Sequence, residues 1–227
     1  MTISVVIPTL NEEHTIAATL SRLRQSAFTE ILIVDGGSQD STLARAATAA
    51  PTARILSTQK GRARQMNIGA AAATGDVLLF LHADTLLPFS AGAEIESALR
   101  DPEVVGGRFD TRLDQDSGLF WLICRMMNWR SRLTGIATGD QALFLRRRVF
   151  EASGGFPDIP LMEDIAFSKN LKRAGRIVAL RSCVITSRRR WQQHGVLRTV
   201  LLMWWLRLLF FLGVSPEKLK RLYIDAR

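Results

Sequence analysis

Cysteine and histidine are scarce in this chain of 227 residues, which contains two cysteines, Cys124 and Cys183, and three histidines. Two cysteines cannot build a disulfide framework, and with three scattered histidines they cannot close a zinc site. This usage fits a reducing compartment. We therefore expect a cytoplasmic protein.

Several sequence signals of common activities are also missing. There is no GxGxxG after the first expected strand, no GxxxxGK[ST] loop, no GxSxG turn and no HExxH pair, so dinucleotide, P-loop, serine-hydrolase and zincin activities lose their usual support. The beginning, MTISVVIPT, has no basic region, longer apolar stretch or small-residue cleavage site, and we expect no export signal.

The length and net charge of the chain narrow the classes of protein that remain possible. The length suits one large domain or one domain with an appendage, and the composition, 47% hydrophobic and 22% charged, is that of a globular protein. A net charge of +9 predicts an anionic partner, which charge alone leaves open between nucleic acid, a phosphorylated small molecule and an acidic membrane surface.

Strand and helix patterns alternate in the first hundred residues, and Asn11 can cap the first helix. This alternation predicts βαβ units and a mainly parallel sheet flanked by helices, an α/β fold. The later part of the chain is less regular. The expected strands are 4–7, 31–34, 54–56, 77–81, 104–109, 142–145 and 177–180, and the expected helices are about 11–23, 41–50, 62–73, 119–133 and 163–174.

Acidic side chains follow three of the expected parallel strands: Glu12, Asp35 and Asp84, the last after the buried run 77–81. Because ligands bind outside the carboxyl ends of such strands, we expect these groups at one edge. Desolvating several carboxylates together is costly unless a cation or hydrogen-bond donors offset it. The pattern therefore predicts a divalent metal, Mg²⁺ or Mn²⁺, that binds Asp84 and a phosphorylated ligand.

Each of these residues also has a structural interpretation. Asp35 before two glycines can be a turn former, Asn11 a helix cap, and His82 a hydrogen-bonded partner. Their joint position at successive strand ends favours the functional interpretation.

Five segments, VVIPTLNE, VDGGSQD, GRARQMNIGAAAATGD, LFLHADT and LMED, follow one another between residues 5 and 164. In this order and spacing they resemble the family 2 inverting glycosyltransferases of the GT-A fold. TGDQALFLRR, GGFPDIPLMED and SRRRW look most similar to short bacterial members labelled as arsenosugar-biosynthesis glycosyltransferases. The resemblance implies a Rossmann-like sheet and metal-dependent transfer of a sugar, with inversion, from a UDP- or GDP-linked donor to an acceptor hydroxyl.

The resemblance also implies residue roles. Asp84, with His82 in place of the first aspartate of the DxD motif, would bind the metal, and Gly36 stands where the family usually has a second aspartate. Asp164, with Glu163 beside it, would be the general base, although both acids would equally favour the positive end of a helix that begins there. The implied nucleotide-sugar-binding residues are Pro8, Thr9, Glu12, Asp35, Arg62, Asp84, Arg190 and Trp191; arginines 188–190 can alternatively be a solvated charge run.

The segment 196–216 is almost wholly apolar. As a membrane span it would place Arg207 near the bilayer centre, at a cost of roughly 2.5–3.5 kcal/mol, so a simple span is not expected. Arg198 and Arg207 lie nine residues apart and fall on opposite helix faces at about 100° per residue. We expect a GT-A domain over 1–190 and an apolar, basic helical appendage over 191–227.

Three locations remain open for this appendage: packing on the domain, an oligomer interface and partial insertion at a lipid surface. Trp204, Trp205 and the KLKR run at 218–221 favour an anionic membrane interface. We therefore expect peripheral contact with the inner face of the membrane.

Three rival functions remain: a nucleotidyltransferase-like enzyme, a basic nucleic-acid-binding protein and a non-catalytic protein at a membrane surface. The acidic pair after a glycine-bearing loop, 154–160, argues against the first. The second has no use for strand-end acids, so we expect a nucleotide-sugar donor and no nucleic acid.

Overall fold

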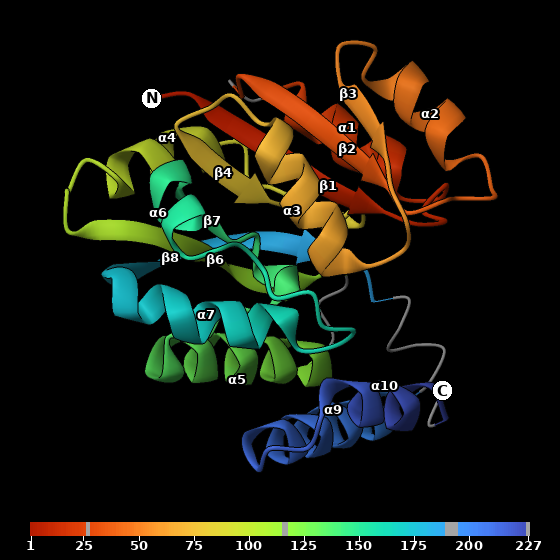
Figure 1. Ribbon diagram of the computed structural model, residues 1–227, viewed down its shortest axis with the longest axis vertical. Coiled ribbons are helices and arrows are strands. Elements are labelled where there is room, and N and C mark those ends of the chain that lie inside the picture. The colour runs from red at the N-terminus through yellow and green to blue at the C-terminus, as the bar shows by residue number, and fades with distance from the viewer. Residues whose placement is uncertain (26–27, 115–117, 189–194, 226–227) are drawn as a thin grey trace.

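The computed structural model describes residues 1–25, 28–114, 118–188 and 195–225. Its strands form one eight-stranded sheet in the order β3-β2-β1-β4-β7-β6-β8-β5 (Figure 1). The strands are β1 (Ile3–Thr9), β2 (Glu30–Asp35), β3 (Arg54–Ser57), β4 (Val77–Phe80), β5 (Thr85–Leu86), β6 (Val104–Leu113), β7 (Phe144–Arg146) and β8 (Arg176–Thr186).

The four strands β3, β2, β1 and β4 are all parallel, as the alternating pattern of the first hundred residues predicts. In the rest of the sheet, β7 is antiparallel to β4 and β6, β8 is parallel to β6, and β5 is antiparallel to β8. The expected α/β fold of the GT-A type is confirmed. Its parallel half brings the carboxyl ends of β1, β2 and β4 to one edge.

Helices cover both faces of the sheet. Side chains of α1, α2 and α4 join the core on one face, and those of α3, α6 and α7 join the core on the other. The helices are α1 (Ile16–Leu23), α2 (Thr42–Ala49), α3 (Arg62–Ala72), α4 (Ala91–Ala98), α5 (Gly118–Thr134), α6 (Arg147–Ala152), α7 (Glu163–Ala174), α9 (Val196–Phe211) and α10 (Pro216–Asp225), with a 3₁₀ turn η1 (Gly139–Gln141).

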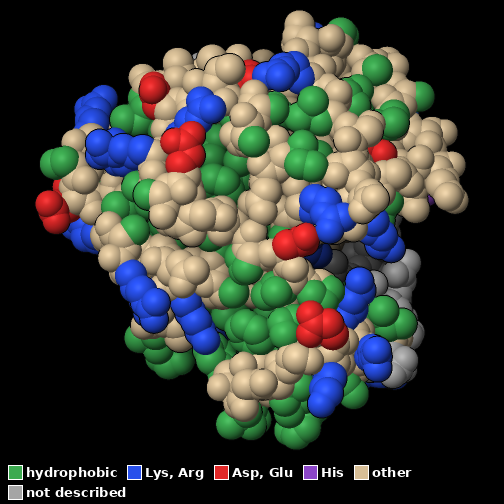
Figure 2. All heavy atoms as spheres, in the orientation of Figure 1, with side chains coloured by type: hydrophobic (Ala, Val, Ile, Leu, Met, Phe, Trp, Pro, Cys, Tyr) green, Lys and Arg blue, Asp and Glu red, His purple; other side chains and the backbone are tan. Residues whose placement is uncertain are grey.

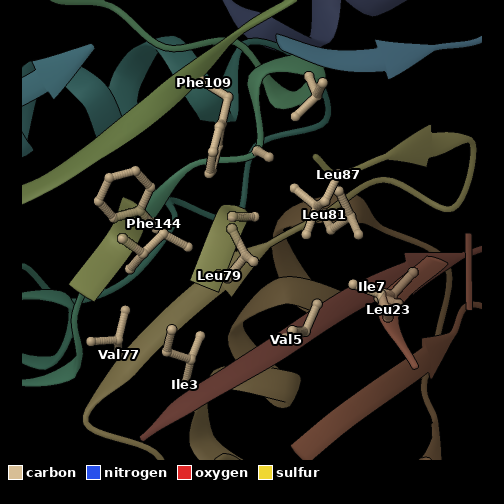
Figure 3. Close-up of a cluster of buried hydrophobic side chains, with 14 of the residues drawn as sticks. Ile3, Val5, Ile7, Leu23, Val77, Leu79, Leu81, Leu87, Phe109 and Phe144 are labelled. Carbon is tan, nitrogen blue, oxygen red and sulfur yellow. The ribbon is translucent and has the colours of Figure 1, made fainter. Parts of the chain in front are cut away.

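The alternation of β1 shows how the two cores are built. Ile3, Val5 and Ile7 enter one core, where Figure 3 shows Ile3 near Val77, its partner on β4, and Ile7 beside Leu23; the intervening Val6 enters the other core. Both faces of the strand are thus buried, as is usual for parallel sheets. Full burial of such side chains stabilises the fold by about 1.5–3 kcal/mol each, which makes β1 and β4 rigid supports for the residues that follow them.

The expected cap of the first helix is wrong. The helix begins at Ile16, and Asn11 has a left-handed φ of 54°, which asparagine tolerates because its short side chain bonds locally. Asn11 accepts a hydrogen bond from the Gln39 amide through Oδ1, 2.9 Å, and its own amide donates to Ser38 Oγ, 2.9 Å. It therefore joins the loops after β1 and β2.

The C-terminal part forms two helices, α9 and α10, which lie beyond α7 and α5 from the sheet (Figure 1). A small core holds them to the start of α7; its buried members are Met162, Ile165, Leu206 and Leu219. In the described residues no helix has the length and apolar character that a membrane crossing needs. The division into 1–190 and 191–227 stays a prediction.

Leu206→Ala tests this packing. Leu206 is fully buried, so we expect the substitution to lower the free energy of unfolding by about 2–5 kcal/mol, measured by urea denaturation. Leu208→Ala is the matched control, because Leu208 lies on the same helix and is 50% exposed; a change within about 0.5 kcal/mol is expected. Equal effects of the two substitutions would contradict the packing of α9 on the domain.

Candidate active site

A cavity of about 190 Å³ lies where the turn after β4, the start of α7, and helices α5 and α9 meet. Asp84 and His82 reach it from the sheet edge, Asp164 from α7 and Arg62 from α3. The structure thus brings together four of the residues that the sequence predicts for the site. The complete lining is Arg62, His82, Asp84, Ile123, Met126, Met127, Arg130, Thr138, Gly139, Asp140, Asp164, Thr186, Ser187, Thr199, Val200, Met203, Trp204 and Arg207.

The His82-Ala83-Asp84 turn is held from two sides. Thr19 of α1 donates its hydroxyl to the Ala83 carbonyl at 2.9 Å, and the Ser187 amide donates to the Asp84 carbonyl at 3.3 Å. The first contact fixes the turn to the helix layer, and the second fixes it to the end of β8. The carboxyl end of β4 therefore presents Asp84 at a defined place in the cavity wall.

Asp164 occupies the first turn of α7. Its Oδ2 accepts the Gly139 amide at 3.0 Å, and its Oδ1 accepts the Ile165 amide at 2.7 Å. The residue before the helix, Met162, has a left-handed φ of 70°, which turns the chain sharply into α7. The helix start thus holds the carboxylate by two backbone amides.

The pKa of Asp164 is raised from 3.8 to about 6. Burial is the largest cause, since it disfavours the charged form, and the neighbouring Glu163 carboxylate adds like-charge repulsion. Arg62 and the amides of Gly139 and Ile165 oppose this rise. A carboxylate with such a pKa can take up a proton near neutral pH.

Glu163 has a different environment from Asp164. Its side chain is 4% exposed, and Oε1 pairs with Arg62 Nη1 at 3.2 Å. Desolvation works to lower the pKa of Arg62, but attraction to Glu163, Asp164, Tyr223 and Asp84 outweighs it and raises that pKa. Glu163 therefore holds the Arg62 cation beside both aspartates, which is a positioning contact.

Gly139 packs directly against His82. A Cβ at position 139 would lie 2.4 Å from Nε2 of His82, closer than any side chain can approach, while the Gly139 amide bonds Asp164. The segment 137–142 therefore touches both ends of the site. Residues 138–142 belong to the run TGDQALFLRR, whose resemblance implies no role for Gly139 or for Asp140, which also lines the cavity.

The predicted nucleotide-binding residues of β1 and β2 lie apart from this cavity. Pro8 lines a smaller adjoining cavity of about 20 Å³ that Arg62, Glu163 and Asp164 also line. Thr9, Glu12 and Asp35 line neither cavity; the contacts of their side chains lie around the carboxyl ends of β1 and β2. Thr9 Oγ1 donates to the Val34 carbonyl, Glu12 Oε2 accepts the Thr15 hydroxyl, and Asp35 Oδ2 accepts the amides of Gly37 and Ser38.

Gln65 of α3 also contributes to this edge, although its role is not predicted from the sequence. Its buried Nε2 donates to the carbonyls of Thr9, 2.7 Å, and Val34, 2.8 Å, and so ties the ends of β1 and β2 together. A Cβ on Gly36 would come within 3.1 Å of the Gln65 side chain. No sequence signal identifies such a contact, because it depends on how α3 lies across the two strands.

The described residues contain no group of three or more histidine, cysteine or acidic side chains that could hold a metal ion. The acids after β1, β2 and β4 are thus not gathered into one metal-ligand cluster. Mg²⁺ often binds through one or two carboxylates together with substrate phosphates. Asp84 in the cavity wall fits such a shared site, whereas Nε2 of His82 is turned toward Gly139. Arg190 and Trp191 lie outside the described residues.

Helices α5 and α9 line a further side of the cavity, and no sequence motif predicts them there. Thr199, Val200, Met203, Trp204 and Arg207 of α9 all line it. The apolar character of 196–211 predicts a helix, but not the surface that the helix covers.

Curated relatives match part of the chain. Glucosyl-3-phosphoglycerate synthases of Mycolicibacterium smegmatis and Mycobacterium tuberculosis (strain ATCC 25618 / H37Rv) are 33% and 34% identical over 99 residues, which is 38% of this chain and 32% and 30% of those proteins. The matched region thus spans about a third of the relatives' length.

Solved structures share the fold over most of the chain. The mannosyltransferase PcManGT from Pyrobaculum calidifontis, in complex with GDP-Man and Mn²⁺, superposes with a TM-score of 0.70 at 21% identity over 99% of this chain and 68% of that one. S. aureus TarS 1-349 in complex with UDP gives 0.67 at 20% identity over 87% and 64%.

The family follows from a match that covers most of the sheet and the turn that carries His82 and Asp84, and that ends before Asp164. Residues 4–153, from β1 through α6, match the family described as glycosyl transferase family 2. The chain belongs to glycosyl transferase family 2.

Proposed function

We propose that this chain transfers a sugar from a nucleotide-sugar donor to an acceptor hydroxyl, with inversion at the anomeric carbon and with a divalent metal. One observation carries the proposal: Asp164, with its pKa raised to about 6, and Asp84 line one cavity at the carboxyl edge of the parallel strands. Family membership and the nucleotide-sugar complexes of the structural neighbours support it.

The chemistry is a single displacement. The acceptor oxygen forms a bond to the anomeric carbon while the bond from that carbon to the donor phosphate oxygen breaks. Asp164 accepts the hydroxyl proton, and the nucleoside diphosphate leaves with the electron pair of the broken bond. Attack opposite the leaving group inverts the anomeric centre. Glu163 keeps Arg62 in place, and this cation attracts the diphosphate.

Asp84 is the residue that would hold Mg²⁺ or Mn²⁺, with donor phosphate oxygens completing the coordination. A bound metal supplies positive charge that stabilises the departing diphosphate. We assign Pro8, Thr9, Glu12 and Asp35 to the nucleotide side, together with Arg190 and Trp191. His82 either positions Gly139 through their contact or serves as a second ligand of the metal ion.

The donor nucleotide is uridine or guanosine diphosphate. The neighbours bind UDP-GlcNAc, UDP and GDP-Man, so the fold accommodates both bases. The curated relatives are named for glucosyl transfer to a phosphoglycerate; the finer likeness to arsenosugar-biosynthesis members stays a prediction.

We also propose that the protein works in the cytoplasm, in peripheral contact with the inner face of the membrane. Exposed apolar side chains gather on α5 and α9, and Figure 2 shows hydrophobic surface over the lower part of the molecule, where α9 and α10 lie in Figure 1. Exposed cations of α10 accompany them, which suits an anionic surface. The apolar members are Leu119, Trp121, Leu122, Met126, Trp129, Leu133, Leu201, Trp204, Trp205, Leu208, Phe211 and Leu212, and the α10 cations are Lys218, Lys220 and Arg221.

Asp84→Asn tests the metal assignment. The substitution keeps the shape of the side chain and removes its charge, so Mn²⁺-dependent affinity for UDP or GDP should fall at least about tenfold, since a charge-assisted bond is worth roughly 1.5–3 kcal/mol. Titration calorimetry with and without Mn²⁺ measures it. Asp158→Asn, at an exposed carboxylate, should bind as wild type does; unchanged affinity in Asp84→Asn would refute the assignment.

The pH profile tests the base. Asp164 acts only when deprotonated, so kcat/KM should rise as pH increases through about 6, its raised pKa, and Asp164→Asn should lower transfer by about 10²–10⁴. Glu163→Gln removes a negative charge that raises this pKa, so the acidic limb should move to lower pH. The measurement is the pH dependence of transfer at saturating metal. An acidic limb that stays in place in Glu163→Gln would exclude Asp164 as its source.

Vesicle binding tests the membrane contact. The double variant Trp205→Ala, Leu208→Ala removes two exposed side chains outside the cavity. We expect wild type to co-sediment with phosphatidylcholine vesicles that contain phosphatidylglycerol, less so at high salt, and the double variant to bind about tenfold more weakly. Phe89→Ala, an exposed aromatic before α4, is the control. Wild type that ignores acidic vesicles at low salt would end the proposal.

A further inference from the structure

Two arginines on facing helices line the cavity and have buried guanidinium nitrogens that make no hydrogen bond within the described residues. They are Arg130 of α5 and Arg207 of α9. Nε and Nη2 of Arg130 and Nε of Arg207 are buried, and within the described ranges these nitrogens donate to no acceptor. Neither residue has a role in the displacement described above.

Such groups require an explanation, because buried guanidinium nitrogens are normally hydrogen-bonded. Burial lowers the pKa of Arg130, and Asp140 and Asp164 act on it in the opposite direction; the side chain stays charged, since arginine is not deprotonated in proteins. The nearby aspartates attract the cation but accept none of these N–H bonds. A ligand that supplies only acceptors, such as phosphate or carboxylate, matches donors arranged in this way.

Resting on the proposed function, we propose that Arg130 and Arg207 bind an anionic group, a phosphate or carboxylate, that the acceptor substrate carries beside its reactive hydroxyl. The acceptor is thus an anionic hydroxyl compound. Its anion lies between α5 and α9, and its hydroxyl faces Asp164.

One observation assigns this anion to the acceptor and not to the donor. Asp164 attracts both Arg130 and Arg62, so the charges around the two cations do not distinguish them, but the cavities that they line do. Pro8, on the nucleotide side, lies by the adjoining cavity, which Arg62 lines and neither Arg130 nor Arg207 does. Arg62 therefore suits the diphosphate, and the other two arginines suit a second anion.

The wall near these arginines is partly apolar. Met126, Met127, Met203 and Trp204 line the same cavity. Apolar side chains beside a guanidinium group lower the local dielectric and strengthen its bonds to an anion. Met126 and Trp204 are themselves exposed, so the wall is open on one side, and the two cations favour a charged acceptor over a neutral one of the same shape.

Binding of inorganic phosphate to the full chain tests the site. We expect phosphate to raise the melting temperature of wild type, and Arg130→Met and Arg207→Met to weaken phosphate binding about 10- to 100-fold each. The matched controls are Arg125→Met on α5 and Arg198→Met on α9, both at exposed arginines, and they should bind phosphate as wild type does. Equal phosphate binding in all variants would overturn the proposal.

A second measurement separates this inference from the proposed function. Affinity for UDP or GDP with Mn²⁺ should be unchanged in Arg130→Met and Arg207→Met; a parallel loss would assign these arginines to the donor and overturn the inference alone. If wild type binds neither UDP nor GDP, the proposed function is contradicted, whether or not wild type binds phosphate. Arg130→Lys and Arg207→Lys keep the charge and should retain partial phosphate binding if the methionine variants do not fold.

The source of the anion is resolved by competition against phosphate. Displacement by glycerol 3-phosphate but not by glycerol indicates a small soluble acceptor. Displacement only by vesicles that contain phosphatidic acid indicates a lipid headgroup. Displacement by neither of these phosphates nor by the hydroxycarboxylate glycerate contradicts an anionic acceptor site, because the site is proposed to bind a phosphate or a carboxylate.

Discussion

The ion pair between Arg62 and Glu163 connects the two halves of the site. It joins the first residue of α3 to the first residue of α7 at 3.2 Å, although 101 positions separate them in the chain. Glu163 is buried while the Arg62 side chain is 42% exposed, so loss of Arg62 would leave a buried carboxylate without its cation, at a cost that solvent around the arginine reduces below that of a fully buried pair. The same ion pair also affects the pKa of Asp164, because Glu163 raises this pKa and Arg62 lowers it. The Arg62–Glu163 ion pair thus both joins α7 to α3 and influences the pKa of Asp164.

The sequence predicts the strands and helices that bury apolar side chains. It does not predict the contacts that position the residues of the candidate site. The runs at 31–34 and 77–81 read as strands because both faces of β2 and β4 are buried, and α7 spans the range expected for it, Glu163–Ala174. Asp84 and Asp164 were identified through their motifs, and the cavity contains both. The roles of Gln65 and Gly139 depend on packing between segments that are distant in sequence, and local sequence patterns do not encode such packing. The two-residue strand β5 is too short for any periodicity.

The C-terminal helix illustrates the limit of reading apolar residues as a membrane signal. Its sequence is apolar on nearly all sides, and the structure uses several of those sides at once. Leu206 packs against α7 and α10, Met203 and Trp204 line the cavity, and Trp205 and Leu208 are exposed. Arg207, which excludes a simple span by its desolvation cost, has its buried Nε beside the cavity wall. Of the two arginines that interrupt the apolar run, Arg198 and Arg207, it is Arg207 that lines the cavity.

Backbone strain marks the edges of this site. In the described chain, Asn11, Ala142 and Met162 are the residues other than glycine with positive φ. Asn11 follows β1, Ala142 follows η1, and Met162 precedes α7. Such conformations cost of order 1–3 kcal/mol each and persist only where surrounding contacts determine them. Ala142 is fully buried and Met162 belongs to the core that holds α9. The packing that fixes the C-terminal helices therefore also stabilises the turn that presents Asp164, because Leu206 of α9 and Met162 before α7 share one core.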